Sequence, residues 1–172
     1  MRIFLTCSLV AALGITYATT LQQLNLDSMA LKSTAIVRGR VQYARTSMTG
    51  SSIYTHYTVQ IAEQWKGAPA AQMDFVVPGG RFNAFQQNVA GSPILDNGQE
   101  YVLFLWTSRS GLTHIIGMSQ GLFVSSNGMV MRPAITEHMI DGNGADVADQ
   151  GMQMTLATMR ARVQSVLKGK AQ

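Results

Sequence analysis

The sequence predicts a mainly β protein: a small antiparallel β-barrel with a short N-terminal helix and a C-terminal amphipathic helix packed on it. Three stretches lead to this prediction. Residues 53–61 alternate apolar or β-branched side chains with more polar ones, which is typical of a strand with one buried face. Residues 101–106 form an unbroken apolar and aromatic run, which indicates a strand covered on both faces. Residues 152–168 repeat apolar side chains at steps of three and four, which indicates a helix with one apolar stripe.

The remaining elements are short and separated by turn residues. We expect a helix or helical turn within residues 22–32, with Thr20 as a candidate N-cap. A strand over residues 35–43 pairs with the strand that starts at Ile53, and the polar residues 44–52 form a long tip between them. Gly, Pro, Ser and Asn bound the further strands that we expect, over residues 72–77, 84–89, 111–116, 122–125 and 129–133.

Two glycines mark special backbone positions. Gly39 lies on the apolar face of the first long strand, where a glycine indicates a bulge or a tight bend at a barrel corner. Gly169 stands where the C-terminal helix is expected to stop. The predicted organisation is a barrel domain over residues 19–135, a linker rich in Gly, Asp and Ala over residues 136–150, and the helix over residues 151–169.

The first 18 residues have the layout of a secretory signal peptide. Met1-Arg2 gives a positive start, residues 3–15 are an apolar run, and residues 16–18 offer small residues where a signal peptidase cleaves. About 13 apolar residues are too few to span a bilayer, which needs roughly 20. A lipid anchor on Cys7 is disfavoured because this residue lies inside the apolar run. We therefore expect a periplasmic or extracellular protein with no transmembrane segment after signal removal.

Cysteine content and charge exclude several classes of function. The chain has one cysteine, Cys7, which leaves with the signal, so disulfides, a thiol nucleophile and a cysteine-based zinc site are excluded from the mature chain. An exported chain without disulfides favours a bacterial envelope. The net charge of +4 is spread thinly, without the basic stripe and interleaved aromatics of a nucleic-acid binder. We expect no nucleic-acid partner.

One motif suggests catalysis. Residues 117–121 match the G-x-S-x-G nucleophile elbow around Ser119, and His138 and Asp141 follow later in the chain. The elbow requires a strand, a strained turn and then a helix, whereas residues 122–124 read as a strand. We interpret the match as accidental and do not expect an enzyme.

Histidine and methionine are the remaining candidate metal ligands. The three histidines, His56, His114 and His138, lack the spacing of a zinc site. The eleven methionines include two pairs with M-x-M spacing, at 129/131 and 152/154. Thioethers suit Cu(I), and Met129 and Met131 would share one face of a strand. Because methionine also fills core gaps, we expect no cofactor and keep a Cu(I) site at Met129 and Met131 as an alternative.

The candidate binding site is an exposed aromatic and basic patch near the turn at residues 78–80. Such a patch would lie at the mouth of the barrel, where folds of this kind bind ligands. The alternative is that the tryptophan and at least one phenylalanine pack in the core. The candidate residues are Trp65, Lys66, Arg81, Phe82 and Phe85.

Three segments together resemble netrin-like modules: Ile-Val-Arg-Gly-Arg-Val at 36–41, the strand from Tyr54-Thr55 to Trp65-Lys66-Gly67, and Gly-Gln-Glu-Tyr-Val-Leu-Phe-Leu at 98–105. Netrin-like modules are OB-type barrels that include the inhibitory domain of tissue inhibitors of metalloproteinases, and uncharacterised exported bacterial proteins share this layout. The resemblance covers roughly residues 33–125 and implies an OB-like β-barrel. Those inhibitors place an N-terminal cysteine on the protease zinc. The mature chain has no cysteine, so the resemblance implies the fold and supplies no site.

The sequence therefore favours an exported, non-catalytic binding module whose partner is an unknown protein or small molecule of the cell envelope. An inhibitor of a secreted metalloprotease is the first alternative and follows only from the resemblance. A periplasmic Cu(I)-binding protein that uses its methionine pairs is the second.

Overall fold

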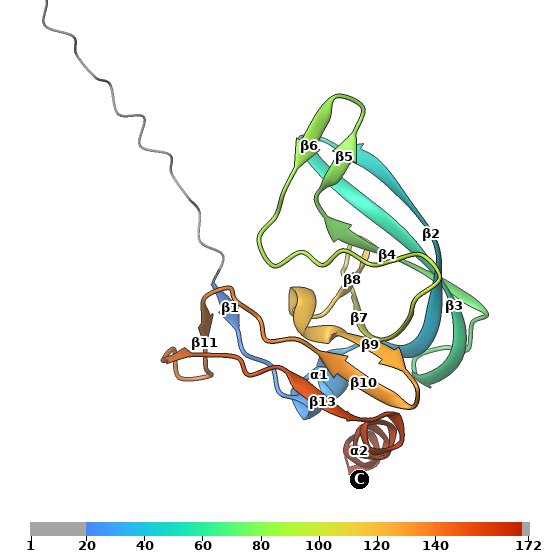
Figure 1. Cartoon of the computed structure of the whole chain (residues 1–172), viewed down its shortest axis with the longest axis vertical. Coiled ribbons are helices and arrows are strands. Elements are labelled where there is room, and N and C mark those ends of the chain that lie inside the picture. Colours follow the sequence, from blue (N-terminus) through green and yellow to red (C-terminus); the bar gives the residue numbers. More distant parts are fainter. Residues whose placement is uncertain (1–19, 170–172) are drawn as a thin grey trace, which may run out of the picture.

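The computed structural model describes residues 20–169, so the predicted signal peptide lies outside the described residues. Within them the protein is mainly β, with a short N-terminal helix and a C-terminal helix, as predicted (Figure 1). None of the helices within residues 20–169 is long and apolar enough to cross a membrane.

Five strands of the largest sheet close into a ring. They follow one another around it in the order β2-β3-β4-β8-β7, and β7 returns to β2. All neighbours in the ring are antiparallel except β4 and β8, which meet in parallel at Val76 and His114. The bounds are β2 Ala35–Thr49, β3 Ser52–Lys66, β4 Gln72–Pro78, β7 Glu100–Thr107 and β8 Thr113–Ile115.

The β2–β3 hairpin is longer than predicted. Both strands have 15 residues, and they pair as far as Thr49 and Ser52. The long polar tip predicted over residues 44–52 is therefore wrong, because the chain turns tightly at Gly50, whose φ is 60°. Residues 44–49 are small or polar and mostly exposed, so this stretch lacks the alternation that identifies a half-buried strand.

Of the two features predicted for Gly39, a bulge or a tight bend, the structure shows an irregularity of the bulge type. The register between β2 and β3 shifts between Arg38 and Gly39. A Cβ atom at position 39 would lie 2.3 Å from the carbonyl oxygen of Gln60, so the backbone of β3 approaches this glycine closely.

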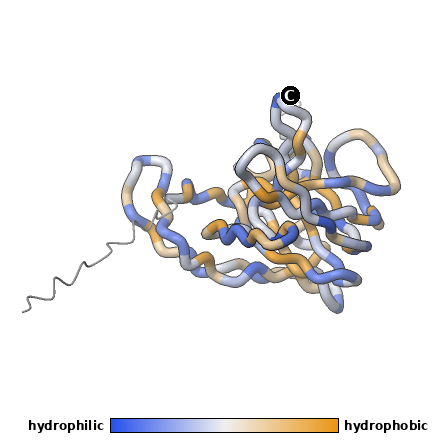
Figure 2. Tube along the Cα trace, turned by 90° about the horizontal axis from the view of Figure 1, so that it is seen from above, coloured by the Kyte–Doolittle hydropathy of each residue, from blue (hydrophilic) through white to orange (hydrophobic). Residues whose placement is uncertain are grey.

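β7 is buried on both faces, as its apolar run predicts. Its residues Tyr101, Leu103 and Leu105 join side chains from every other ring strand in one interior cluster. Val102 and Phe104 point to the opposite face, into a second cluster that includes residues of both helices. The centre of the protein in Figure 2 is accordingly rich in hydrophobic segments.

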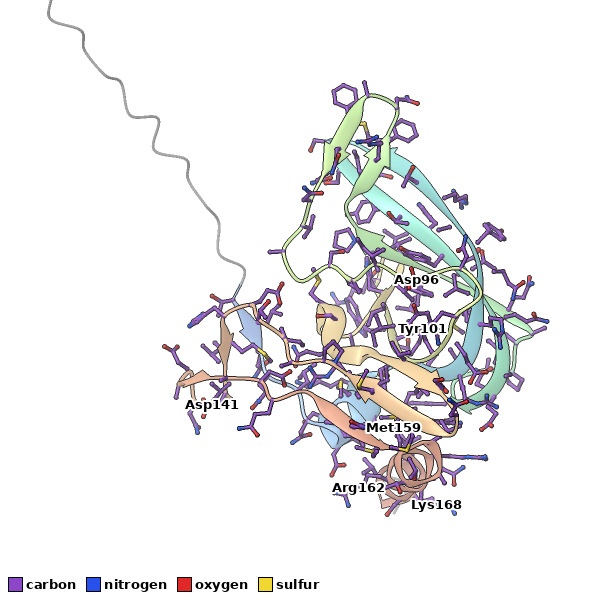
Figure 3. The ribbon with its side chains drawn as sticks, viewed as in Figure 1. Asp96, Tyr101, Asp141, Met159, Arg162 and Lys168 are labelled. Atoms are coloured by element: carbon purple, nitrogen blue, oxygen red, sulfur yellow. The ribbon has the colours of Figure 1, made fainter. Side chains whose placement is uncertain are left out.

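The sheet continues beyond β7 through β9, β10 and β13, and two helices cover its outer face. Met29 of α1 and Met159 and Val163 of α2 are fully buried against this face. Figure 3 shows Met159 on the side of α2 that faces the sheet. The bounds are α1 Leu26–Lys32, β9 Leu122–Ser126, β10 Met129–Arg132, β13 Met152–Thr155 and α2 Leu156–Gly169.

α1 lies within the range predicted for it, residues 22–32, but its N-cap differs from the prediction, and α2 begins later than predicted. Asn25, and not Thr20, is the N-cap of α1, because its side chain accepts a hydrogen bond from the N–H of Ser28 at 2.8 Å. The helix predicted over residues 151–169 begins at Leu156, because residues 152–155 alternate and pair with β10 as β13. The hydroxyl of Thr155 accepts a hydrogen bond from the N–H of Thr158 and caps α2.

Two small sheets complete the fold. Residues 80–87 form a hairpin of β5 (Gly80–Phe82) and β6 (Phe85–Gln87). Within residues 136–150, predicted as a linker, β11 (Met139–Ile140) and β12 (Asp146–Val147) form a sheet with β1 (Leu21–Gln22). Strands of two residues are too short for periodicity to reveal.

Candidate functional site

A row of directly opposed residues crosses four ring strands on their outer surface. Trp106 of β7 pairs with His114 of β8, which pairs with Val76 of β4, which in turn pairs with His56 of β3. Neighbours of these residues along the strands, such as Leu105 and Ile115, belong to the interior cluster. Since successive side chains of a strand point to opposite faces, the row faces outward.

The row contributes to an aromatic groove of about 410 Å³. The indole of Trp106 and the imidazole of His114 lie side by side, with ring centroids 6.2 Å apart and planes at 31°. The Trp106 side chain is 45% exposed, which is unusual for so large an apolar group. We define the aromatic groove by six of its lining residues: Tyr54, Val76, Pro78, Trp106, His114 and Met118.

The groove is electrically neutral. None of the described residues that line it is Asp, Glu, Lys or Arg. Burial lowers the pKa of His114 below its ordinary value, so its imidazole is uncharged at pH 7. A charged ligand would lose water in this groove without gaining a partner of opposite charge. The groove therefore favours uncharged ligands.

The G-x-S-x-G segment lies at the end of this groove and does not have the geometry of a nucleophile elbow. After β8 the chain turns at Gly117 into a four-residue 3₁₀-helix, Met118–Gly121, and continues directly into β9. The left-handed backbone falls on Gly117 and Met118, each with φ of 61°, and not on Ser119. The segment positions Met118 in the groove.

The histidines are engaged in separate places. The Nε2 atom of His56 is hydrogen-bonded to the hydroxyl of Ser47 at 2.7 Å, and burial, reinforced by the positive charge of Arg45, lowers the pKa of His56. His138 contacts Asp146 at 2.9 Å in the small sheet of β1, β11 and β12. No group of three or more His, Cys, Asp or Glu residues able to hold a metal ion occurs within residues 20–169.

The methionine pairs lie on opposite faces of the β10–β13 ribbon. Met152 and Met154 pair with Arg132 and Val130 and pack against the helix-covered core. Met129 and Met131 alternate with those residues and point to the other face, where Met131 is 48% exposed. The four thioethers therefore do not converge on one ion.

The structure separates the five predicted patch residues into two groups at opposite ends of β3. Trp65 packs against the helix-covered core, and its indole N–H donates to Glu63 at 3.1 Å. The ammonium of Lys66 donates to the last carbonyl groups of α1, those of Ala30 and Leu31. Both residues thus attach β3 to the helices, and the single patch predicted from sequence does not form.

Arg81, Phe82 and Phe85 lie together on the β5–β6 hairpin, near the start of β3 (Figure 1). The hairpin borders a second cavity of about 510 Å³ at the mouth of the ring, which we call the mouth pocket. Two interior tyrosines hold the loop between β6 and β7, which lines the pocket. The hydroxyl of Tyr57 accepts a hydrogen bond from the N–H of Leu95, and the hydroxyl of Tyr101 accepts one from the N–H of Asp96. Figure 3 labels Tyr101 and Asp96 at this place.

Sequence reasoning missed Tyr54, Trp106 and His114 as site residues. Trp106 lies on the same face of β7 as Val102 and Phe104, at the end of the strand. This spacing could have indicated that its side chain points away from the interior of the ring and is not covered by a helix. No sequence signal shows that β8 pairs with both β4 and β7, and this pairing is what brings the groove residues together.

No family model matches the chain, and none of the curated proteins compared with it is similar.

Proposed function

We propose that this protein is an exported, non-catalytic binding module that holds an uncharged cyclic ligand in the aromatic groove. The observation that carries the proposal is the pair of rings, Trp106 and His114, lying side by side on an exposed and neutral surface. Export rests on the signal-peptide layout of residues 1–18.

The connectivity of the ring supports an OB-like β-barrel. Counted in chain order, the first ring strand pairs with the second and the fourth, and the third pairs in parallel with the fifth. The OB-fold is a five-stranded, partly open Greek-key barrel that binds ligands on its second and third strands. Those strands are β3 and β4 here, and both line the groove. This analogy of fold supports the position of a site on β3 and β4 and names no ligand.

The chemistry of the groove supports a ring-shaped ligand. A ring stacked on the indole and the imidazole would cover both of their exposed faces, and stacking of this kind contributes about 1–3 kcal/mol. The hydroxyl of Tyr54 and the nitrogens of His114 are the polar groups that could orient such a ring. Few polar groups in a mainly apolar depression are typical of small-molecule sites.

Tryptophan fluorescence tests this proposal. The chain has two tryptophans, so a Trp65→Phe background leaves Trp106 as the only tryptophan that emits. We expect saturable fluorescence changes with a neutral oligosaccharide such as chitotriose, or with an uncharged aromatic probe such as benzyl alcohol, which does not emit where tryptophan does. Binding measured by calorimetry should weaken about tenfold or more in Trp106→Ala.

Met131→Ala is the matched control, because Met131 is exposed to the same degree as Trp106 and lies outside the groove. It should bind the probes as the unaltered protein does. Equal affinity in Trp106→Ala and Met131→Ala, or the absence of saturation with every probe, would contradict the proposal.

A further inference from the structure

We propose that the mouth pocket is a second binding site, specific for a small organic anion with an apolar body. This inference is independent of the aromatic groove, although both cavities share Val77 and Pro78 of β4. At about 510 Å³ the pocket is within the range of small-molecule sites.

The side-chain amide oxygens that line the pocket each accept a hydrogen bond from within the protein. Arg81 donates to the amide oxygen of Gln86, and Gln86 donates to the amide oxygen of Asn88. The amide oxygen of Gln87 accepts from the N–H of Ile53. Within residues 20–169, the amide nitrogens of Gln87 and Asn88 are left without an acceptor, and the Arg81 guanidinium uses only one of its nitrogens.

The backbone carbonyls at the rim are occupied in the same way. The hydroxyl of Thr55 donates to the carbonyl of Gly79, and the hydroxyl of Ser92 donates to the carbonyl of Pro78. A ligand entering the pocket therefore meets N–H groups of Arg81, Gln87 and Asn88, whereas the amide and carbonyl oxygens beside them already accept hydrogen bonds. Such a site favours a ligand rich in acceptors.

The positive charge of the pocket favours an anion over other ligands rich in acceptors. Arg81 is the one charged residue among the described residues that line the pocket. Guanidinium and amide N–H groups suit a carboxylate, whose two oxygens accept in a bidentate manner. Glu137 lies beside Gly91 and lines a neighbouring depression, not this pocket.

The other wall of the pocket is apolar. Tyr57, Val77, Val89 and Pro93 line it, and Ile94 stands at its rim with 86% of its surface exposed. Covering so exposed an isoleucine with the hydrocarbon body of a ligand is favourable, because apolar surface is removed from water. The combination of a basic rim and an apolar wall fits an amphiphilic carboxylic acid better than inorganic phosphate.

Octanoate is the probe that tests this site, with octanol and acetate as partial analogues. We expect octanoate to bind in calorimetry at micromolar to millimolar concentration, as befits so small a ligand. Octanol lacks the charge and should bind about tenfold more weakly. Acetate lacks the apolar body and should bind more weakly than octanoate. Amide shifts in nuclear magnetic resonance should fall on Gly79, Gly80 and Asn88.

Two variants address the two halves of the pocket. Arg81→Gln should weaken octanoate about tenfold and leave octanol unchanged. Ile94→Asn should weaken the binding of octanoate and of octanol. Because Ile94 is exposed, this substitution should not change the stability of the fold. Arg109→Gln is the matched control, since it removes the same charge from the exposed β7–β8 loop and should change nothing.

Four outcomes would overturn the inference. They are no saturable binding of octanoate at millimolar concentration, equal affinity for octanoate and octanol, equal effects of Arg81→Gln and Arg109→Gln, and shifts centred on the Trp106 side chain. Should Arg81→Gln fail to fold, the octanol comparison and Ile94→Asn still decide the matter.

Discussion

At position 39 of β2, only a residue without a side chain fits. The Cβ of any other residue would meet the carbonyl oxygen of Gln60 at 2.3 Å and a methyl group of Val59 at 2.7 Å. Both atoms belong to β3, the neighbouring strand in the ring. Because one of them is backbone, a rotamer change cannot relieve the contact, and β2 must move away from β3 where the register between them shifts.

Gly39→Ala should therefore lower the free energy of unfolding by roughly 2 kcal/mol. Gly142→Ala is the matched control, since no atom lies within 4 Å of the Cβ it would add and its φ is not positive. Urea unfolding followed by circular dichroism measures both variants. If the urea midpoint of Gly39→Ala equals that of Gly142→Ala, β3 does not approach position 39 this closely.

The buried ion pair of Arg132 and Asp149 is the second residue-scale feature. The two side chains are 5% and 7% exposed and are joined by hydrogen bonds of 2.6 and 2.9 Å. The Asp149 carboxylate also accepts from the N–H groups of Ile135 and Gly151. It thereby ties the segment after β10 to the segment before β13.

Asp149→Ala should cost about 3–5 kcal/mol, because it leaves a buried guanidinium without a counter-ion. Asp146→Ala removes the exposed partner of His138 and should change the unfolding midpoint little. Thermal and urea unfolding of the two variants provide the comparison. Similar losses in both would show that burial of the pair is not what makes it important.

At the scale of elements, burial contributes more than exposed ion pairs to holding α2 in place. Met159 and Val163 are fully buried in the helix-covered cluster of the sheet. Arg162 and Asp27 join α2 to α1 through two hydrogen bonds, but both side chains are exposed to solvent. Exposed ion pairs contribute little, whereas a buried methionine contributes through packing.

Met159→Ala should therefore destabilise the protein by about 2–5 kcal/mol. Arg162→Ala should leave the urea midpoint close to that of the unaltered protein, in low salt and in 1 M salt alike. A larger loss from Arg162→Ala than from Met159→Ala would reverse this assignment.

The elements that could be predicted from sequence are those in which the order of apolar and polar side chains shows which faces are buried. The run at 101–106 predicted that β7 is covered on both faces, and the apolar stripe predicted α2. The predictions failed where pairing with a neighbouring strand decides the structure. Residues 44–49 form part of a strand because β2 and β3 pair along their whole length. Residues 152–155 form a strand because they pair with β10. Propensity is a weak guide in such stretches.

At the scale of the whole molecule, both candidate sites depend on closure of the ring. The aromatic groove needs β8 beside β4 and β7, and the mouth pocket needs the β5–β6 hairpin beside the start of β3. Both are contacts between segments distant in the sequence. The sequence accordingly predicted Arg81, Phe82 and Phe85 as neighbours, which a hairpin makes local, but placed Trp65 and Lys66 wrongly beside them.

The stability of the whole protein should fall in two steps as pH decreases. Burial lowers the pKa values of His56 and His114, so the unfolded chain takes up protons near the ordinary value of 6.5 before the folded chain does. Stability is therefore unaffected by these groups above that pH and decreases below it. The hydrogen bond from Arg132 lowers the pKa of Asp149, so the stability that this carboxylate contributes is lost only in a lower window, below its ordinary value of 3.8.

The double variant His56→Gln/His114→Gln separates the two steps, because it removes the titrating groups of the upper window and keeps Asp149. Urea midpoints measured from pH 8 to pH 3 should decline between pH 7 and pH 5 in the unaltered protein and stay nearly level in the variant, while both decline below about pH 4. An equal decline between pH 7 and pH 5 would mean that His114 is as free to take a proton in the folded protein as in the unfolded chain. The groove would then carry a charge in mildly acidic solution, and uncharged ligands would lose their advantage there.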